Sequence, residues 1–177
     1  DLSSGHQPIG NETGRVWIVF NGEIYNYQDL RTQLIAAGHA FRTNSDTETI
    51  VHAYEQWGDD CVTRLRGMFA FALWDGDRQR LLLARDRFGK KPFFYTLRNG
   101  TFLFASEISA IVRHPAALAS VSRRSLKKYF AYGYIPAPAT ILEGVSKLPG
   151  GHSLTFDLDT RQVKVDKYWD FVIEPFD

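Results

Sequence analysis

The pattern that most restricts the fold is a change of periodicity near residue 68. Before it, apolar residues recur at helical spacing in two segments, whereas after it short strand-like runs follow one another between Gly, Asp and Asn turns. The strands predicted from these runs are 68–74, 81–85, 92–97 and 102–105. Consecutive strands of this kind are typical of an antiparallel meander. The sequence therefore predicts an α+β fold instead of alternating βαβ units.

Helices are predicted where apolar residues recur every three or four positions between a capping residue and a stop signal. The predicted helices are 27–37, 46–57, 59–66, 107–113 and 123–132. Asn26 and Ser45 precede the first two, and both residue types cap helices. Ser45 together with Glu48 also fits a capping box, in which each side chain binds the other residue's backbone N–H.

A further strand is predicted over residues 15–20, whose nearly continuous apolar run is typical of a strand covered on both faces. Asn21 and Gly22 then form a strong turn signal, because both tolerate positive φ. Residues 1–14 show no periodicity and predict an ordered loop. The remaining predicted strands are 39–42 and a hairpin made of 153–157 and 163–169.

Composition narrows the possible partners. The chain has 177 residues, which suits one domain, and its 21 Lys and Arg against 20 Asp and Glu leave a net charge of +1 without a basic block. We therefore expect neither nucleic acid nor a membrane surface as partner. A single cysteine, Cys61, excludes an internal disulfide framework and favours a reducing, cytoplasmic setting.

The end of the strand 15–20 carries three groups with different chemistry. Asn21 offers an amide donor, and Gly22 allows a backbone N–H to approach a ligand closely. Two such donors aimed at one point can hold a developing oxyanion, and Glu23 beside them can pair with an ammonium group. The alternative is an ordinary turn with a solvated glutamate.

Two further segments have a structural and a functional interpretation. Asp46 at a helix start can use the helix dipole to stay ionised and bind an amino group, but from the residues alone a helix cap is the better interpretation of this segment. The cations around Arg87 and Lys90 suggest phosphate binding, yet no glycine-rich cradle precedes a helix there. A basic hairpin turn with a salt bridge is the better interpretation of that segment.

These segments, in this order, closely resemble the amino-terminal domain of glutamine-dependent asparagine synthetases, a class II glutamine amidotransferase of the N-terminal-nucleophile (Ntn) hydrolase fold. The segments that carry the resemblance are FNGEIYNY at 20–27, NSDTE at 44–48, RDRFGKKPFFY at 85–95, DLSSGHQP at 1–8, FASEI at 104–108 and YIPAP at 134–138. It covers essentially the whole chain, and sister amidotransferases share only shorter versions of these motifs. The resemblance implies a four-layer αββα sandwich over residues 1–177, missing its first strands, with the synthetase domain absent.

The resemblance also implies roles for four residues. In the family an N-terminal cysteine thiolate attacks the side-chain amide of glutamine, ammonia leaves, and water releases glutamate. By motif position, Asn21 and Gly22 would form the oxyanion hole. Glu23 and Asp46 would hold the α-amino group of glutamine, so the substrate-binding set is Asn21, Gly22, Glu23 and Asp46. The turn around Arg87 and Lys90 would remain structural.

The chain departs from the family at its start. It begins at Asp1, without the nucleophilic cysteine and without the arginine that grips the glutamine carboxylate. Cys61 is no replacement, because it lies mid-chain without a free α-amine and is expected to be a small buried apolar residue. We therefore expect an inactive fragment of an enzyme that hydrolyses glutamine and supplies ammonia to an ATP-dependent synthetase domain.

An alternative parent never had the cysteine and uses the fold as a structural or amino-acid-binding domain. For this domain we expect no metal and no cofactor, whereas ATP and Mg are expected for the missing synthetase domain. The expected partners are glutamine and that C-terminal domain, with a homodimer possible. The ammonia acceptor is undecided, since aspartate and other carboxylates are served by similar glutaminase halves.

Overall fold

The structure is a computed structural model that describes residues 6–117 and 120–173. The chain forms two compact units, one made of Asp1–Lys90 with Gly150–Asp177 and the other of Lys91–Pro149. No helix within the described ranges is long and apolar enough to cross a membrane. Of the loop predicted over 1–14, residues 1–5 lie outside the described part, and the remainder includes a two-residue strand.

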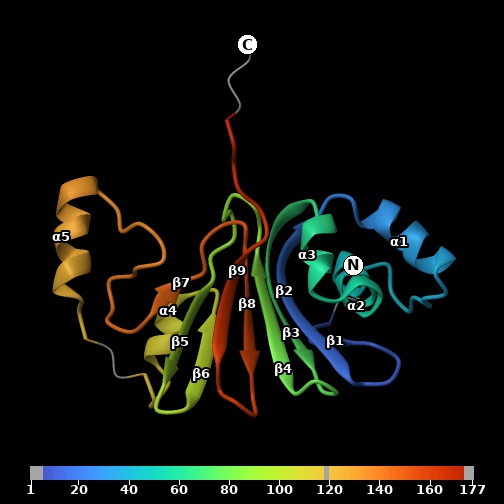
Figure 1. Cartoon of the computed structure of the whole chain (residues 1–177), viewed down its shortest axis with the longest axis horizontal. Coiled ribbons are helices and arrows are strands. Elements are labelled where there is room, and N and C mark those ends of the chain that lie inside the picture. The colour runs from blue at the N-terminus through green and yellow to red at the C-terminus, as the bar shows by residue number, and fades with distance from the viewer. Residues whose placement is uncertain (1–5, 118–119, 174–177) are drawn as a thin grey trace. The chain divides into compact units, whose positions relative to one another are not determined.

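The first unit is built on a six-stranded antiparallel sheet of order β1-β2-β3-β4-β8-β9. Its strands are β1 (Ile9–Gly10), β2 (Val16–Ile24), β3 (Gly67–Asp75), β4 (Arg80–Arg85), β8 (His152–Asp157) and β9 (Val163–Lys167). Its helices are α1 (Tyr27–Ala36), α2 (Asp46–Trp57) and α3 (Cys61–Arg64), with a 3₁₀ turn at Gly58–Asp60 before α3. Figure 1 shows these helices gathered beside β2 and β3.

The core of this unit lies between the sheet and its helices. The register places Ile18 of β2 opposite Leu73 of β3, and Leu73 opposite Leu82 of β4, so these side chains share one face of the sheet. All three are buried, and Leu34 of α1 and Ile50 of α2 belong to the same apolar cluster. Burial of this face fixes α1 and α2 on the sheet.

The second unit contains a smaller antiparallel sheet of order β6-β5-β7. Its elements are β5 (Phe94–Arg98), β6 (Thr101–Ala105), β7 (Ser146–Lys147), α4 (Ile108–Val112) and α5 (Arg123–Tyr132). Helix α5 is capped at its start by Ser122, whose hydroxyl accepts the Ser125 N–H, and at its end by Gly133 in the left-handed conformation. These ends are the ones predicted from the sequence.

The predicted α+β class is confirmed, but the predicted meander is divided. Strands β3 and β4 pair as expected, and β5 pairs with β6. However, β4 takes β8 as its second neighbour, because the chain leaves the first unit after Lys90 and returns at Gly150. The four strands predicted as one meander therefore belong to two sheets: β3 and β4 to the first, and β5 and β6 to the second.

The predicted strand 15–20 continues further than expected. Strand β2 runs to Ile24, so the turn predicted at Asn21 and Gly22 is wrong. Pairing with β3 continues through this segment, from Val16 opposite Asp75 to Ile24 opposite Gly67, and it overrides the local turn preference. Coverage on both faces is also wrong here, since Trp17 and Val19 are 41% and 42% exposed.

The strand predicted over 39–42 is absent, and these residues form a loop between α1 and α2. The Glu48 carboxylate accepts the backbone N–H of Arg42 and of Thr43, each at 2.7 Å. It also accepts the Thr43 hydroxyl at 2.6 Å. A side chain thus satisfies the N–H groups that a neighbouring strand would otherwise bind.

Candidate functional site

The end of β2 presents two of the predicted residues, Asn21 and Glu23, on the side of the sheet that does not face the helices. Side chains alternate along a strand, and in β2 Ile18 and Ile24 are buried whereas Asn21 and Glu23 are exposed. Asn21 and Glu23 therefore lie on the same face, two positions apart. Gly22 between them lies on the opposite face.

Gly22 is required by the neighbouring strand. A Cβ added there would lie 2.1 Å from the Met68 carbonyl oxygen and 2.7 Å from the Phe69 Cα. The φ of Gly22, +155°, is also one that residues with side chains rarely adopt. The close approach of β3 therefore explains why glycine occupies position 22, which the sequence alone did not show.

The register also sets the direction of the Gly22 backbone N–H. The Phe20 N–H donates to Gln7 Oε1 at 2.6 Å, and the Ile24 N–H donates to Asp46 Oδ2 at 2.9 Å, both away from β3. Backbone N–H groups of alternate residues point to the same edge of a strand. The Gly22 N–H is therefore directed to this same edge, between the other two.

The opposite strand supports this assignment. The Phe69 N–H donates to Asp86 Oδ2 at 3.2 Å, and the Phe69 carbonyl accepts the Asp86 N–H at 2.8 Å. Phe69, which lies opposite Gly22, thus directs both backbone groups toward Asp86. Gly22 and Phe69 therefore form a non-hydrogen-bonded pair of the antiparallel ladder.

Asp46 joins the start of α2 to the end of β2. It is the first residue of the helix, after Ser45, whose hydroxyl accepts the Thr47 N–H at 3.2 Å. Its hydrogen bond from the Ile24 N–H spans 22 positions of the sequence. The two predicted segments are therefore brought together by a carboxylate that also lies at the positive end of a helix dipole.

The capping box predicted for this helix forms only in part. Ser45 is the N-cap, as expected, but the carboxylate of Glu48 binds the Arg42 and Thr43 backbone instead of the Ser45 N–H. The Ser45 N–H donates to the Thr43 hydroxyl at 3.1 Å. Glu48, 3% exposed, thus holds the loop that precedes Asp46.

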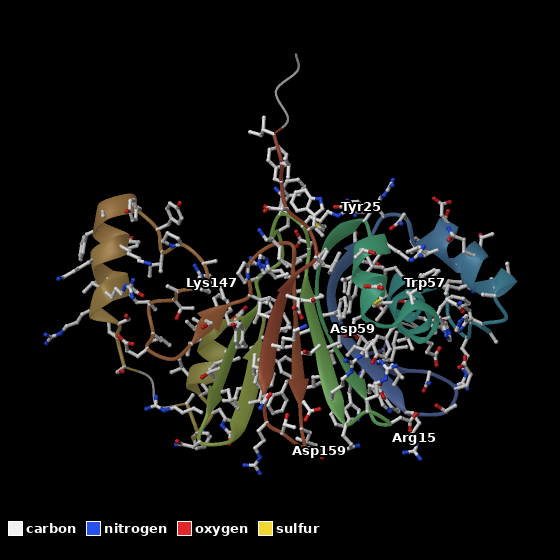
Figure 2. All side chains as sticks on the ribbon, viewed as in Figure 1. Arg15, Tyr25, Trp57, Asp59, Lys147 and Asp159 are labelled. Carbon is white, nitrogen blue, oxygen red and sulfur yellow. The ribbon has the colours of Figure 1, made fainter. Side chains whose placement is uncertain are left out.

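Glu23 and Asp46 line one pocket of about 350 Å³. Its other lining residues are Ile24, Tyr25, Tyr27, Asn44 and Ser45. Tyr25, which is labelled in Figure 2, lies where β2 ends and is 65% exposed. Within the described residues, Asn21 and Gly22 precede this pocket in β2 and do not line it.

Tyr25, Tyr27 and Asn44 are pocket residues that we did not single out from the sequence. All three stand inside the FNGEIYNY and NSDTE segments, so the motifs themselves were the available signal. Asn26, expected to cap α1, binds elsewhere: its amide donates to the Arg64 carbonyl at 3.0 Å and accepts the Arg66 N–H at 2.9 Å. It ties the pocket segment to the loop before β3.

The basic turn after β4 is organised around a buried acid. Asp86 is 1% exposed, and its Oδ1 accepts the N–H of Phe88 at 3.1 Å and of Lys90 at 2.9 Å. The Arg87 guanidinium donates to the Thr63 carbonyl at 3.2 Å. These contacts agree with the structural role predicted for this segment.

Cys61 cannot serve as an accessible nucleophile in this fold. It begins α3, is 0% exposed and belongs to the apolar core. Burial raises the pKa of the Cys61 thiol above its ordinary value, with the negative charge of Asp59 acting in the same direction. Since the thiolate is the reactive form, this cysteine is inert, as expected from the sequence.

Comparison with known proteins gives three consistent results. Residues 1–169 match the sequence profile of the glutamine amidotransferase domain. The chain is 45% identical over 172 residues to "Asparagine synthetase [glutamine-hydrolyzing] 3" of Bacillus subtilis, covering 96% of this chain and 28% of that protein. It is 38% identical over 159 residues to "Asparagine synthetase [glutamine-hydrolyzing] 1" of the same organism, covering 90% and 25%.

Among solved structures, the chain resembles the glutamine phosphoribosylpyrophosphate amidotransferase of B. subtilis. The TM-score is 0.63 at 18% identity, over 94% of this chain and 32% of that one. At this identity the likeness concerns the fold, and it supports the Ntn-hydrolase type predicted from the motifs. The chain spans only about a quarter of the length of the two curated relatives described above.

Proposed function

Because the chain belongs to the glutamine amidotransferase domain family, we propose that it is the glutaminase part of an asparagine-synthetase-like enzyme. In this proposal the domain hydrolyses glutamine to glutamate and supplies ammonia to a synthetase domain. The observation that carries the proposal is the pocket shared by Glu23 and Asp46, which joins two motif segments that are distant in the sequence.

Glu23 and Asp46 hold the α-amino group of glutamine. Two acidic residues lining one small pocket favour an ammonium group, and hydrogen bonds between ionised partners are stronger than neutral ones. The hydrogen bond from the Ile24 N–H orients the Asp46 side chain before the ligand arrives. Such preorganisation reduces the entropy lost on binding.

Asn21 and Gly22 stabilise the oxyanion. The side-chain amide of Asn21 and the backbone N–H of Gly22 are both donors, and they follow each other on β2, directly before the residues that line the pocket. The Gly22 N–H points away from β3, to the edge where Phe20 and Ile24 already donate to side chains. Donors fixed in a sheet need no rearrangement when charge develops.

The nucleophile is supplied by a cysteine other than Cys61, which is fully buried. We assign this role to the N-terminal cysteine that the family resemblance implies for the parent enzyme. Its thiolate attacks the side-chain amide carbon of glutamine, ammonia leaves as the carbon–nitrogen bond breaks, and water cleaves the thioester to release glutamate. ATP and Mg belong to the synthetase domain in this scheme.

The pocket is tested by measuring glutamine binding to the chain by calorimetry or NMR. Asp46→Asn keeps an oxygen that can accept the Ile24 N–H but removes the charge, so glutamine affinity should fall by about 1.5–3 kcal/mol, the range for hydrogen bonds to charged groups. Asp29→Asn, at an exposed position in the first turn of α1, is the charge-matched control and should leave binding unchanged. Equal effects of the two variants would refute the assignment.

Catalysis is tested in the parent enzyme by glutamate release. Asn21→Ala should lower kcat more than it raises KM, at a cost of about 2.7–4 kcal/mol if this residue behaves like other oxyanion donors. Synthesis driven by free ammonia should be unaffected, because it bypasses this domain. A parent that binds glutamine but never releases glutamate would instead support the non-catalytic amino-acid-binding alternative.

A further inference from the structure

We propose that His39, His52 and Glu55 form a binding site for a divalent transition-metal ion of the Zn²⁺ type. This site is separate from the glutamine pocket and does not depend on the proposed function. One ligand atom of each residue lies within 4.8 Å of the other two. Imidazole nitrogens with one carboxylate are a typical ligand set for such ions, whereas Mg²⁺ and Ca²⁺ prefer oxygen ligands.

The donor atoms of these side chains already converge. Glu55 Oε2 lies 2.7 Å from His52 Nδ1 and 3.5 Å from His39 Nδ1. Zn–N and Zn–O bonds of about 2.0–2.2 Å require tetrahedral ligands about 3.3–3.5 Å apart. Binding of the ion requires the 2.7 Å contact between Glu55 and His52 to widen, whereas the Glu55–His39 separation already fits, and the two histidine ligand atoms lie within 4.8 Å of each other.

Each side chain is oriented by a second contact. His39 Nε2 lies 3.0 Å from Gln56 Oε1 and donates to it, which leaves the His39 Nδ1 lone pair directed toward Glu55. Glu55 Oε1 accepts the Asn11 side-chain amide at 2.7 Å, so Oε2 faces the histidines. Such outer contacts fix ligands in metal sites.

The buried imidazole of His52 points to the same conclusion. It is 1% exposed, and its Nε2 has no hydrogen-bond partner among the described residues. Two carboxylates approach this nitrogen, Glu12 at 3.7 Å and Glu48 at 3.8 Å. When Nδ1 binds a metal, the proton of the neutral ring lies on Nε2, and the negative charges of these two carboxylates, although beyond hydrogen-bond distance, favour it there.

The charge around the cluster also favours a cation. Within the described ranges, the recorded contacts of the Glu12, Glu48 and Glu55 carboxylates with basic side chains are all to histidines, and none is to Lys or Arg. His39 and Glu55 both reach solvent, so an ion can enter and water can complete its coordination. A bound ion would tie the loop after α1 to the middle of α2.

The test uses the whole chain, freed of metal by a chelator and titrated with ZnCl₂ and then with Co²⁺. We expect one equivalent to bind, a higher melting temperature that EDTA reverses, and the visible absorption of a tetrahedral Co²⁺ complex. His39→Asn and Glu55→Gln should each weaken binding at least about 100-fold, and Glu12→Gln about 10-fold, following the range for outer-contact residues.

His114→Asn is the matched control, because it removes an exposed histidine of the second unit. It should bind zinc like the unmodified chain. The proposal is overturned if the chain binds no stoichiometric zinc, if His39→Asn and Glu55→Gln bind normally, or if all variants weaken equally. Should a variant fail to fold, ¹⁵N NMR of the unmodified chain decides: zinc must shift the Nδ1 signals of two histidines, and unchanged signals refute the site.

Discussion

Two aspartates, Asp46 and Asp86, stand in short motif segments, and both carboxylates accept backbone N–H groups. Asp86 is 1% exposed and accepts the N–H of Phe69, Phe88 and Lys90. Asp46 accepts one recorded backbone N–H, from Ile24, and lines a pocket of about 350 Å³. The first carboxylate is used to build a turn, whereas the second is held in place and left within reach of a ligand.

This difference supports a structural role for Asp86 and agrees with the ligand-binding role proposed for Asp46. Both segments are rich in polar residues, and the sequence already favoured a structural interpretation of the segment around Asp86. Its burial and the number of its internal hydrogen bonds agree with that interpretation. A carboxylate whose lone pairs are directed to several backbone donors offers little to a substrate.

The largest expected effect is that of Asp86→Ala. The change leaves three backbone N–H groups in a buried turn without their acceptor, and each such loss costs about 1–3 kcal/mol. The free energy of unfolding should fall by about 4 kcal/mol, measured from the urea midpoint at constant m. If Asp86→Ala lowered the free energy of unfolding by less than about 1 kcal/mol, Asp86 would not be the more structural of the two aspartates.

Gly22→Ala tests whether the two regions are independent. Gly22 lies opposite Phe69, which Asp86 holds, and the added Cβ would overlap the Met68 carbonyl. Backbone strain of this kind costs about 1–3 kcal/mol, and β2 and β3 must move apart to relieve it. Amide hydrogen exchange should then quicken at Phe69 as well as in the pocket segment. If exchange became faster only in the pocket segment and not at Phe69, the segments around Asp46 and Asp86 would respond independently.

The smallest expected effect on stability is that of Asp46→Ala, the matched counterpart of Asp86→Ala. Only the Ile24 N–H loses a recorded acceptor, at a partly exposed position, so the loss should be about 1 kcal/mol. Glutamine binding should nevertheless be lost. A variant that unfolds as readily as Asp86→Ala, in the same denaturation assay, would make Asp46 a structural residue as well.

Elements with strong periodicity and clear ends were predictable from the sequence. The range predicted for α2 agrees with the structure, Asp46–Trp57, and α5 likewise begins after Ser122 and ends at Gly133. In both helices a hydroxyl cap gives a local signal that needs no tertiary contact. The pairing of β3 with β4 is similarly set by a short connection.

The errors concern residues whose structure depends on distant contacts. Gly22 was assigned to a turn because Asn-Gly favours one locally, but pairing with β3 keeps it in a strand. Glu48 was assigned to a capping box, whereas it binds the loop before the helix. For the site, Asn21, Gly22, Glu23 and Asp46 were expected to converge on one concavity. Glu23 and Asp46 line one pocket, whereas Asn21 and Gly22 precede it on β2 and do not line it, and the roles of the individual residues stay predictions.

The junction at Gly150 has a consequence for how the chain can vary. A Cβ at Gly150 would lie 2.8 Å from the Gly89 nitrogen, and the Gly151 N–H donates to the Asp86 carbonyl at 2.9 Å. The points where the chain leaves and re-enters the first unit are therefore in contact, and residues 91–149 form a topological insertion. For a flexible loop, each doubling of length adds only about 0.6 kcal/mol of closure entropy. The first unit should accordingly tolerate inserts of very different size at this junction, provided that Gly89 and Gly150 stay side by side.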